Sequence, residues 1–118
     1  IGYLNADGTI ENSSRSTVGY FDPSGSGWTI ENSSRSTIGY VESNGDASYT
    51  IENDSRSTVG YMDVDGSSNW TVENSSRSTV GYIGKDGEVE DGSRSTLGHA
   101  PDVPPAWAAV YFFFFRFP

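Results

Sequence analysis

The sequence has no cysteine, one histidine and few basic residues. The lack of cysteine excludes disulfides, thiol nucleophiles and cysteine-ligated zinc. Lysine and arginine number 7 against 16 aspartates and glutamates, which gives a formal net charge of -9. Nucleic-acid binding requires a basic surface that neutralises phosphates, so we expect no nucleic-acid partner.

The chain also lacks long hydrophobic runs and is poor in large aliphatic residues. No apolar run approaches the roughly 18 residues that a spanning helix needs, so we predict no membrane span. Leucine, isoleucine, valine and phenylalanine make up 23 of 118 residues, a content close to that of disordered chains. No signal-like segment is seen at Ile1. We interpret the chain as a mature exported protein, extracellular or periplasmic.

What the sequence does contain is a short repeat, which decides against disorder. Arg-Ser-Thr occurs five times, with successive arginines 20, 21, 21 and 17 residues apart. An apolar-Gly-aromatic triplet precedes each unit, and a sixth, degenerate copy, Leu97-Gly98-His99, follows the last unit. The five full triplets are Ile1-Gly2-Tyr3, Val18-Gly19-Tyr20, Ile38-Gly39-Tyr40, Val59-Gly60-Tyr61 and Val80-Gly81-Tyr82. Such a period indicates one supersecondary unit that is stacked several times.

Each unit has the pattern of a β-hairpin. A first turn such as Asp7-Gly8 follows the triplet, and Asp-Gly pairs favour tight turns in which both central residues have positive φ. A short strand over residues 9–12 comes next. In the second turn the second residue, Ser13 in the first unit, is small or turn-forming, and we expect it to take a tight or left-handed backbone.

Alternation along the strands predicts which face each residue occupies. Val18 and Tyr20 are predicted to share one face, opposite Gly19. One isoleucine or valine per strand makes a thin core, so the hairpins must pack side by side to bury it. We predict an all-β fold, a five-fold pseudo-symmetric array of hairpins over residues 1–99. The recurrence of the triplet at the end predicts closure into a ring, which would leave no unpaired sheet edge.

A different composition begins at residue 100. Pro101, Pro104 and Pro105 predict a stiff, non-helical lead-in, and residues 106–115 are apolar on both faces. As a strand, the segment from Trp107 to Phe117 would span about 35 Å. We predict that this apolar C-terminal segment, residues 100–118, fills or caps the ring as part of one domain. A contact with a partner, or with further copies of the chain, is the alternative.

The repeat and the tail together resemble a known group of proteins. Residues 8–20, Gly-Thr-Ile-Glu-Asn-Ser-Ser-Arg-Ser-Thr-Val-Gly-Tyr, and the run Phe112-Phe113-Phe114-Phe115 are similar to small repeat proteins of gut bacteria that are described as five-fold β-flowers. The resemblance implies a pseudo-five-fold assembly of hairpins. It implies no activity and no site residues.

The clearest difference among the units is aromatic. The three middle units have longer first loops and carry Trp28, Tyr49 and Trp70 two residues before the strand isoleucine or valine, where the outer units have glycine. A row of aromatic rings can hold sugar rings by stacking. These residues are therefore the candidate ligand-binding site of a carbohydrate-binding module. The competing interpretation is that parity places them on the isoleucine face, where they cap the core.

The repeated arginines offer a second candidate site. If the units are related by rotation, the arginines lie on a ring that could bind an anion. The competing interpretation is that each arginine pairs with a glutamate of the repeat, an interaction of little energetic weight at the surface. The candidate anion ring is Arg15, Arg35, Arg56, Arg77 and Arg94.

We predict no enzymatic activity. His99 replaces the tyrosine of the triplet, and no Ser–His–acid motif stands out. The acidic loops around Asp65 and Asp86 lack the twelve-residue calcium pattern, and no glycine-rich phosphate loop is present. We therefore predict no metal site, no cofactor and no catalytic residue. The favoured function is a structural or interaction module whose partner is a polysaccharide or another protein.

Overall fold

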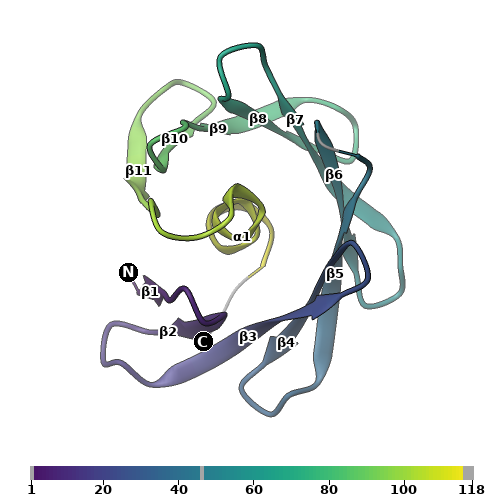
Figure 1. Ribbon diagram of the computed structural model, residues 1–118, viewed down its shortest axis with the longest axis vertical. Coiled ribbons are helices and arrows are strands. Elements are labelled where there is room, and N and C mark those ends of the chain that lie inside the picture. The colour runs from purple at the N-terminus through teal and green to yellow at the C-terminus, as the bar shows by residue number, and fades with distance from the viewer. Residues whose placement is uncertain (1, 46, 116–118) are drawn as a thin grey trace.

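The chain folds into one antiparallel β-sheet that curls around a short helical segment (Figure 1). The computed structural model describes residues 2–45 and 47–115. Consecutive strands are neighbours in the sheet, so the predicted all-β fold built from hairpins is confirmed. The strands are β1 (Tyr3–Leu4), β2 (Thr9–Glu11), β3 (Thr17–Ser24), β4 (Gly27–Asn32), β5 (Thr37–Ser43), β6 (Ser48–Asn53), β7 (Thr58–Val64), β8 (Trp70–Asn74), β9 (Thr79–Ile83), β10 (Glu88–Asp91) and β11 (Thr96–His99).

Two kinds of strand alternate in this sheet. The odd-numbered strands carry or directly follow an apolar-Gly-aromatic triplet, and we call them triplet strands. The even-numbered strands carry the glutamate of the repeat, and we call them glutamate strands. Each glutamate strand pairs with a triplet strand on both sides. In β4, for example, Ile30 lies opposite Phe21 of β3 and opposite Gly39 of β5.

The sheet stays open between β1 and β11. Among the described residues no pairing joins these two strands, so the predicted closure of the ring is not confirmed. Consecutive strands are antiparallel, so β1 and β11 run in the same direction and could not extend the antiparallel pairing by meeting each other. Both edges are triplet strands, whereas every pairing within the sheet joins a triplet strand to a glutamate strand. Ile1, the start of the first triplet, lies outside the described residues.

A β-bulge ahead of the triplet glycine in β3, β5, β7, β9 and β11 changes the predicted faces. The register shifts after Ile10, which lies opposite Gly19, and leaves Val18 as the extra residue. Val18 is buried in the core, whereas Tyr20 lies on the outer face beneath the Arg35 side chain. The prediction that Val18 and Tyr20 share a face is therefore wrong, because a bulge adds one residue and reverses the alternation.

The second turns place an arginine, and not a small residue, in the left-handed region. Arg15 has a φ of 65°, and the four equivalent arginines have φ between 66° and 70°. The Asn12 side-chain oxygen accepts the backbone N–H groups of Ser14 and Ser16 and so fixes the turn. Ser13 lies in a tight turn, as one of the two expectations had it, since the Arg15 N–H donates to the Asn12 carbonyl at 3.0 Å. The left-handed alternative is wrong, because the positive φ falls two residues later.

The first turn of the first unit also differs from the prediction. Gly8 has a φ of 96°, but Asp7 has an ordinary φ, so only one of the two central residues is left-handed. The Asp7 carboxylate accepts the Thr9 N–H at 3.0 Å, and the Gly8 N–H donates to the carbonyl of Asn5. The aspartate therefore acts as a hydrogen-bonding side chain, and the glycine alone provides the unusual backbone.

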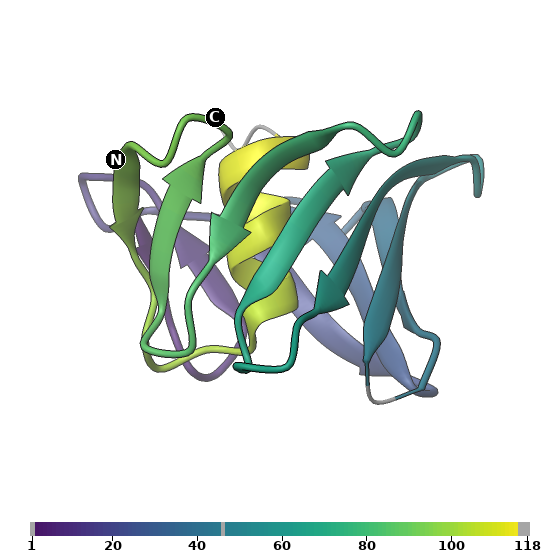
Figure 2. The ribbon, with the colours of Figure 1, turned by 90° about the horizontal axis from the view of Figure 1, so that it is seen from above.

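The tail is helical and stands inside the curled sheet, as the view from above shows (Figure 2). α1 (Pro105–Ala109) continues directly into a π-helical turn, η1 (Val110–Phe114). The predicted strand from Trp107 is wrong, and its far end at Phe117 lies outside the described residues. Pro105, expected in a non-helical lead-in, opens α1 instead, a position where the missing N–H costs no hydrogen bond.

The surroundings of the tail explain its helical conformation. A lone strand at the centre of the sheet would leave its N–H and C=O groups without partners, whereas a helix pairs them internally. An apolar run alone cannot distinguish these two conformations.

Within the described ranges, no helix has both the length and the apolar character needed to cross a membrane.

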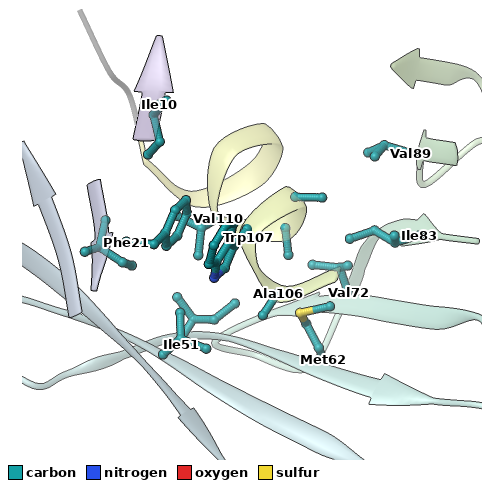
Figure 3. Packing of buried hydrophobic residues seen from close by; sticks show 14 of the residues in the cluster. Ile10, Phe21, Ile51, Met62, Val72, Ile83, Val89, Ala106, Trp107 and Val110 are labelled. Carbon is teal, nitrogen blue, oxygen red and sulfur yellow. The ribbon is translucent and has the colours of Figure 1, made fainter. Parts of the chain in front are cut away.

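Side chains from both kinds of strand point at the helix and form the core (Figure 3). Glutamate strands contribute their isoleucine or valine, as Ile51 does, and triplet strands contribute the residue after the aromatic, as Met62 does. The residues contributed by the triplet strands therefore add a second set of side chains to the thin core that the sequence indicated. From the helix, the Trp107 ring stacks on Phe21 with ring centroids 4.8 Å apart. The Trp107 indole N–H is buried and has no acceptor among the described residues.

Candidate functional site

Five aromatic rings anchor the helical tail, and each packs on a triplet glycine. An added Cβ on Gly39 would lie 2.5 Å from Cζ of Phe115, and one on Gly98 would lie 2.8 Å from Cζ of Phe112. The pairs are Tyr111 with Gly2, Phe112 with Gly98, Phe113 with Gly81, Phe114 with Gly60 and Phe115 with Gly39. These five triplet glycines therefore leave the space into which the five rings pack. The sequence showed the repeated glycine without showing this role.

The π-helical turn explains how consecutive residues reach consecutive repeats. From Tyr111 to Phe115 the rings reach triplet glycines that run around the sheet in one direction, from the β1 side to β11, β9, β7 and β5. In an α-helix, successive side chains point about 100° apart around the helix axis. This angle is larger than the angle between neighbouring triplet strands when six of them surround the same axis. The Phe115 N–H donates to the Val110 carbonyl at 3.1 Å, and this wider i→i+5 turn advances less per residue.

On the outer face, each repeat arginine lies between one tyrosine and one glutamate. The guanidinium carbon of Arg56 lies 3.6 Å from the centre of the Tyr40 ring, and its Nη1 donates to Glu52 at 2.9 Å. In the three middle units a second carboxylate, such as Glu42, binds the same guanidinium. The stacked pairs are Arg15 on Tyr3, Arg35 on Tyr20, Arg56 on Tyr40, Arg77 on Tyr61 and Arg94 on Tyr82.

These contacts use the residues that were predicted as a candidate anion ring. Every one of the five arginines forms an ion pair with the glutamate four residues earlier. The hydrogen bond from Arg15 lowers the pKa of the Glu11 carboxyl and in turn raises the pKa of Arg15. Because each positive charge is compensated within its own repeat, the geometry favours the ion-pair interpretation over an anion site.

Trp28, Tyr49 and Trp70 lie side by side on the inner face of the sheet. The Tyr49 ring centroid is 6.0 Å from that of Trp28 and 5.3 Å from that of Trp70, with tilted planes in both pairs. Trp28 also meets Trp107 edge-on at 5.8 Å. All three are half-buried against the core. Tilted rings that pack on the core offer no continuous flat face, so no observation favours sugar binding at this row.

The acidic loops that suggested calcium are organised as turns. Asp65 accepts the backbone N–H groups of Ser67 and Asn69, and Asp86 accepts that of Glu88. Within residues 2–45 and 47–115, no group of three or more histidine, aspartate and glutamate side chains is placed to hold a metal ion. The carboxylates of these loops therefore have a structural role in holding the hairpins.

The open side of the sheet, between β1 and β11, forms the strongest candidate site, and we call it the seam (Figure 1). A cavity of about 180 Å³ lies there, lined by residues 2–5, residues 99–103, Tyr111 and Phe112. The rings of Tyr111 and Phe112 meet edge to face with centroids 5.2 Å apart. Burial raises the pKa of the Tyr111 hydroxyl. The cavity thus lies between the two ends of the sheet and two aromatic rings of the tail.

Exposure at the seam differs from exposure elsewhere in the sheet. In the described part of the chain, the large hydrophobic side chains that stay exposed are Tyr3 on the β1 side and Leu97 on β11. Leu97 is 46% exposed, whereas Val18, its equivalent in β3, is 7% exposed. β3 has a glutamate strand on both sides, and β11 has one on a single side. The sequence marked this strand only by the change from tyrosine to His99.

Comparison with known proteins gives a family and no activity. A family described as "5-fold beta-flower protein" matches residues 1–116. No curated protein and no solved structure matches the chain. The match supports the β-flower resemblance of the repeat unit and of the phenylalanine run. The origin in gut bacteria stays a prediction.

Proposed function

The chain belongs to the 5-fold beta-flower family, and from that premise we propose that it is a non-enzymatic structural or interaction module. The family's description names a fold and no activity. The function must therefore be argued from the surfaces that this fold offers.

The observation that carries the proposal is the occupied interior. A small-molecule site is usually a concave pocket with a few convergent polar groups. Here the middle of the curled sheet holds the chain's own helix, with Ala106, Ala108, Ala109 and Val110 fully buried. No polar or charged residue in the described part of the chain is buried. The tail thus fills the space that a ligand would need, and recognition is left to the outer face and the seam.

The outer face supports a partner that is neither nucleic acid nor an anionic membrane. The net charge of -9 opposes both. The stacked arginines give each repeat a fixed arrangement of polar groups on this face. We propose a protein or polysaccharide partner outside the cell, in keeping with the expected export. Since Ala106–Val110 pack within their own chain, a homo-oligomer would have to form through other surfaces than these tail residues.

Site-specific photocrosslinking tests this proposal. A benzophenone side chain is placed at an exposed turn position, such as Ser33, and at a seam position, such as Leu97. The protein is then irradiated with the secreted fraction of its source organism. We expect a discrete adduct from at least one position. The same protein is incubated with ester, peptide, glycoside and phosphate-ester substrates.

The outcomes separate a module from an enzyme. Product formation that disappears when the protein is heat-unfolded would contradict the proposal. If no crosslinked adduct forms from either position with the folded protein, the proposal is also contradicted. As a control, a benzophenone at the buried Val41 should give no intermolecular adduct, because that position faces the core.

A further inference from the structure

The seam interrupts an alternation that holds everywhere else in the sheet. From β2 to β10, every triplet strand lies between two glutamate strands. β1 and β11 each have one glutamate strand and one side without a paired strand in the described chain. A free strand edge presents N–H and C=O groups that an added strand can pair with.

The backbone of β11 keeps the geometry of an internal triplet strand beyond its assigned end. The Ala100 N–H donates to the Gly87 carbonyl at 2.8 Å, just as the Phe21 N–H donates to the Gly8 carbonyl at 2.7 Å. Position 100 is therefore equivalent to position 21. The free side of β11 is built like the side of β3 on which β4 pairs.

The register of β3 with β4 predicts the chemistry of a strand added to β11. In that pair Glu31 lies opposite Tyr20, and Ile30 lies opposite Phe21. The same register on β11 would place an acidic residue opposite His99 and a β-branched apolar residue opposite the alanine that follows. On its paired side His99 already lies opposite Glu88 of β10, whereas the equivalent Tyr20 lies opposite Thr9 of β2. The acidic residue expected on the free side of β11 therefore follows from the register of β3 with β4 alone.

The exposed side chains define the apolar part of this surface. Leu97 and Tyr3 flank the seam, and the rings of Tyr111 and Phe112 line its cavity. The residues equivalent to Leu97 in the internal triplet strands are buried or half-buried. Those internal strands each have a second glutamate strand beside them, which β11 lacks in the described part of the chain.

We propose that the seam binds an extended segment of a partner protein, which adds along β11 as a strand and carries a β-branched apolar residue followed by an acidic residue. This inference rests on the proposed interaction function and specifies the form of the partner. The strand pattern also argues against a second copy as the occupant. All five glutamate strands of the chain are already paired on both sides, and a triplet edge is never paired with another triplet edge in this sheet.

A labelled peptide with the sequence of β6, Ser48–Asn53, tests the proposal directly, because this sequence is a glutamate strand of the protein itself. Fluorescence anisotropy follows its titration with the full-length protein. We expect saturable binding, together with slower amide hydrogen exchange in Thr96–His99. No saturation up to about 1 mM protein, an affinity of only about 4 kcal/mol, would overturn the proposal.

Two variants that each place a glutamate at an exposed position provide a matched test and control. His99→Glu should weaken binding of the peptide about tenfold, through like-charge repulsion. A peptide with lysine in place of glutamate should regain affinity for that variant. Ser26→Glu, in the exposed β3–β4 turn, should leave binding unchanged. Equal weakening by both variants, or exchange protection elsewhere than β11, would contradict the assigned site.

The oligomeric state and the activity screen keep the two proposals distinguishable. A concentration-dependent dimer that excludes the peptide would contradict a partner segment as the occupant. If the peptide does not bind but crosslinked adducts still form from the outer face, the seam proposal is wrong and the proposal of an interaction module is retained. Enzymatic turnover would remove the module, whatever the peptide does.

Discussion

The Phe115 ring lies where the side chain of residue 39 would have to lie. A Cβ on Gly39 would sit 2.5 Å from Cζ of that ring and 2.7 Å from the backbone oxygen of Glu52. The ring is held by the π-helical turn, and the oxygen is held by the sheet. The repeated glycine and the phenylalanine run of the tail are therefore two halves of one packing arrangement.

Gly39→Ala should destabilise the protein by about 1–3 kcal/mol, because the added methyl group overpacks the space that the Phe115 ring fills. Urea denaturation measures this loss. The control is Gly66→Ala, where an added Cβ meets nothing within 4 Å and φ is ordinary, and we expect a change within about 0.5 kcal/mol. Equal costs at the two positions would mean that the ring does not constrain residue 39.

Trp107 allows the ring and its N–H to be tested separately. Trp107→Ala should cost about 3–5 kcal/mol, because it removes a buried ring that stacks on Phe21. Trp107→Phe should cost much less, because it keeps an aromatic ring there and removes a buried N–H that has no acceptor among the described residues. Thermal and urea unfolding give both values. If the phenylalanine variant were as unstable as the alanine variant, the indole N–H would have an unrecognised partner.

Arg56 combines favourable contacts with a strained backbone. Arg56→Ala and Arg56→Gly both lose the Tyr40 stack and the Glu52 ion pair, but only glycine relieves the φ of 66°. We expect both variants to be less stable than the wild type. The glycine variant should have the higher melting temperature of the two, by a few degrees. Identical melting curves would show that the left-handed arginine carries no strain.

The aromatic row can be tested for a structural role against a sugar-binding role. Trp28→Ala should destabilise the fold by about 1–3 kcal/mol, because the ring packs on Tyr49 and Trp107. Tryptophan fluorescence during polysaccharide titration of the wild type provides the second measurement. A variant of unchanged stability that loses saturable polysaccharide binding would restore the carbohydrate hypothesis.

The acid side of the pH profile should depend on Glu11. Its pKa is lowered in the folded state, chiefly by the hydrogen bond from Arg15, from an ordinary value of 4.5. The unfolded chain therefore takes up this proton first as the pH falls. The stability from Glu11 is complete above about pH 4.5 and is lost as the pH falls through the folded-state pKa. Urea midpoints between pH 3 and 7 should fall less steeply for Glu11→Gln, and parallel profiles would contradict the ion pair's role.

Several features of the fold could be predicted from the sequence because they depend on local patterns. The recurrence of Arg-Ser-Thr and of the triplet gave five hairpins in one all-β domain. The repeated glutamates were correctly predicted as ion-pair partners of the arginines, and the structure decided that each arginine pairs with the glutamate of its own repeat. The predicted features involve residues that are close in the chain, so spacing alone defines them.

The features that were missed involve a register shift or a distant partner. The bulge at Val18 reversed the face of every later residue in that strand, and one extra residue leaves no mark on composition. The residue after each triplet, such as Met62, was not recognised as core for the same reason. The recurrence of the triplet predicted that the two ends of the sheet meet, but not that β1 and β11 stay unpaired and leave a cavity between them.

The sequence by itself determined the repeat, the hairpins, the two strands of each repeat unit and the acidic surface, because each follows from local spacing and composition. Only the tertiary structure decided that the sheet stays open and that the tail is a helix. An apolar run has no intrinsic preference strong enough to choose strand or helix. The helix is chosen because the segment lies inside a curled sheet. The triplet glycines of that sheet leave space for the aromatic rings, but its strands present no free hydrogen-bonding groups at the centre. In the same way, the mismatch between β1 and β11 exists only once five hairpins have brought two like edges together.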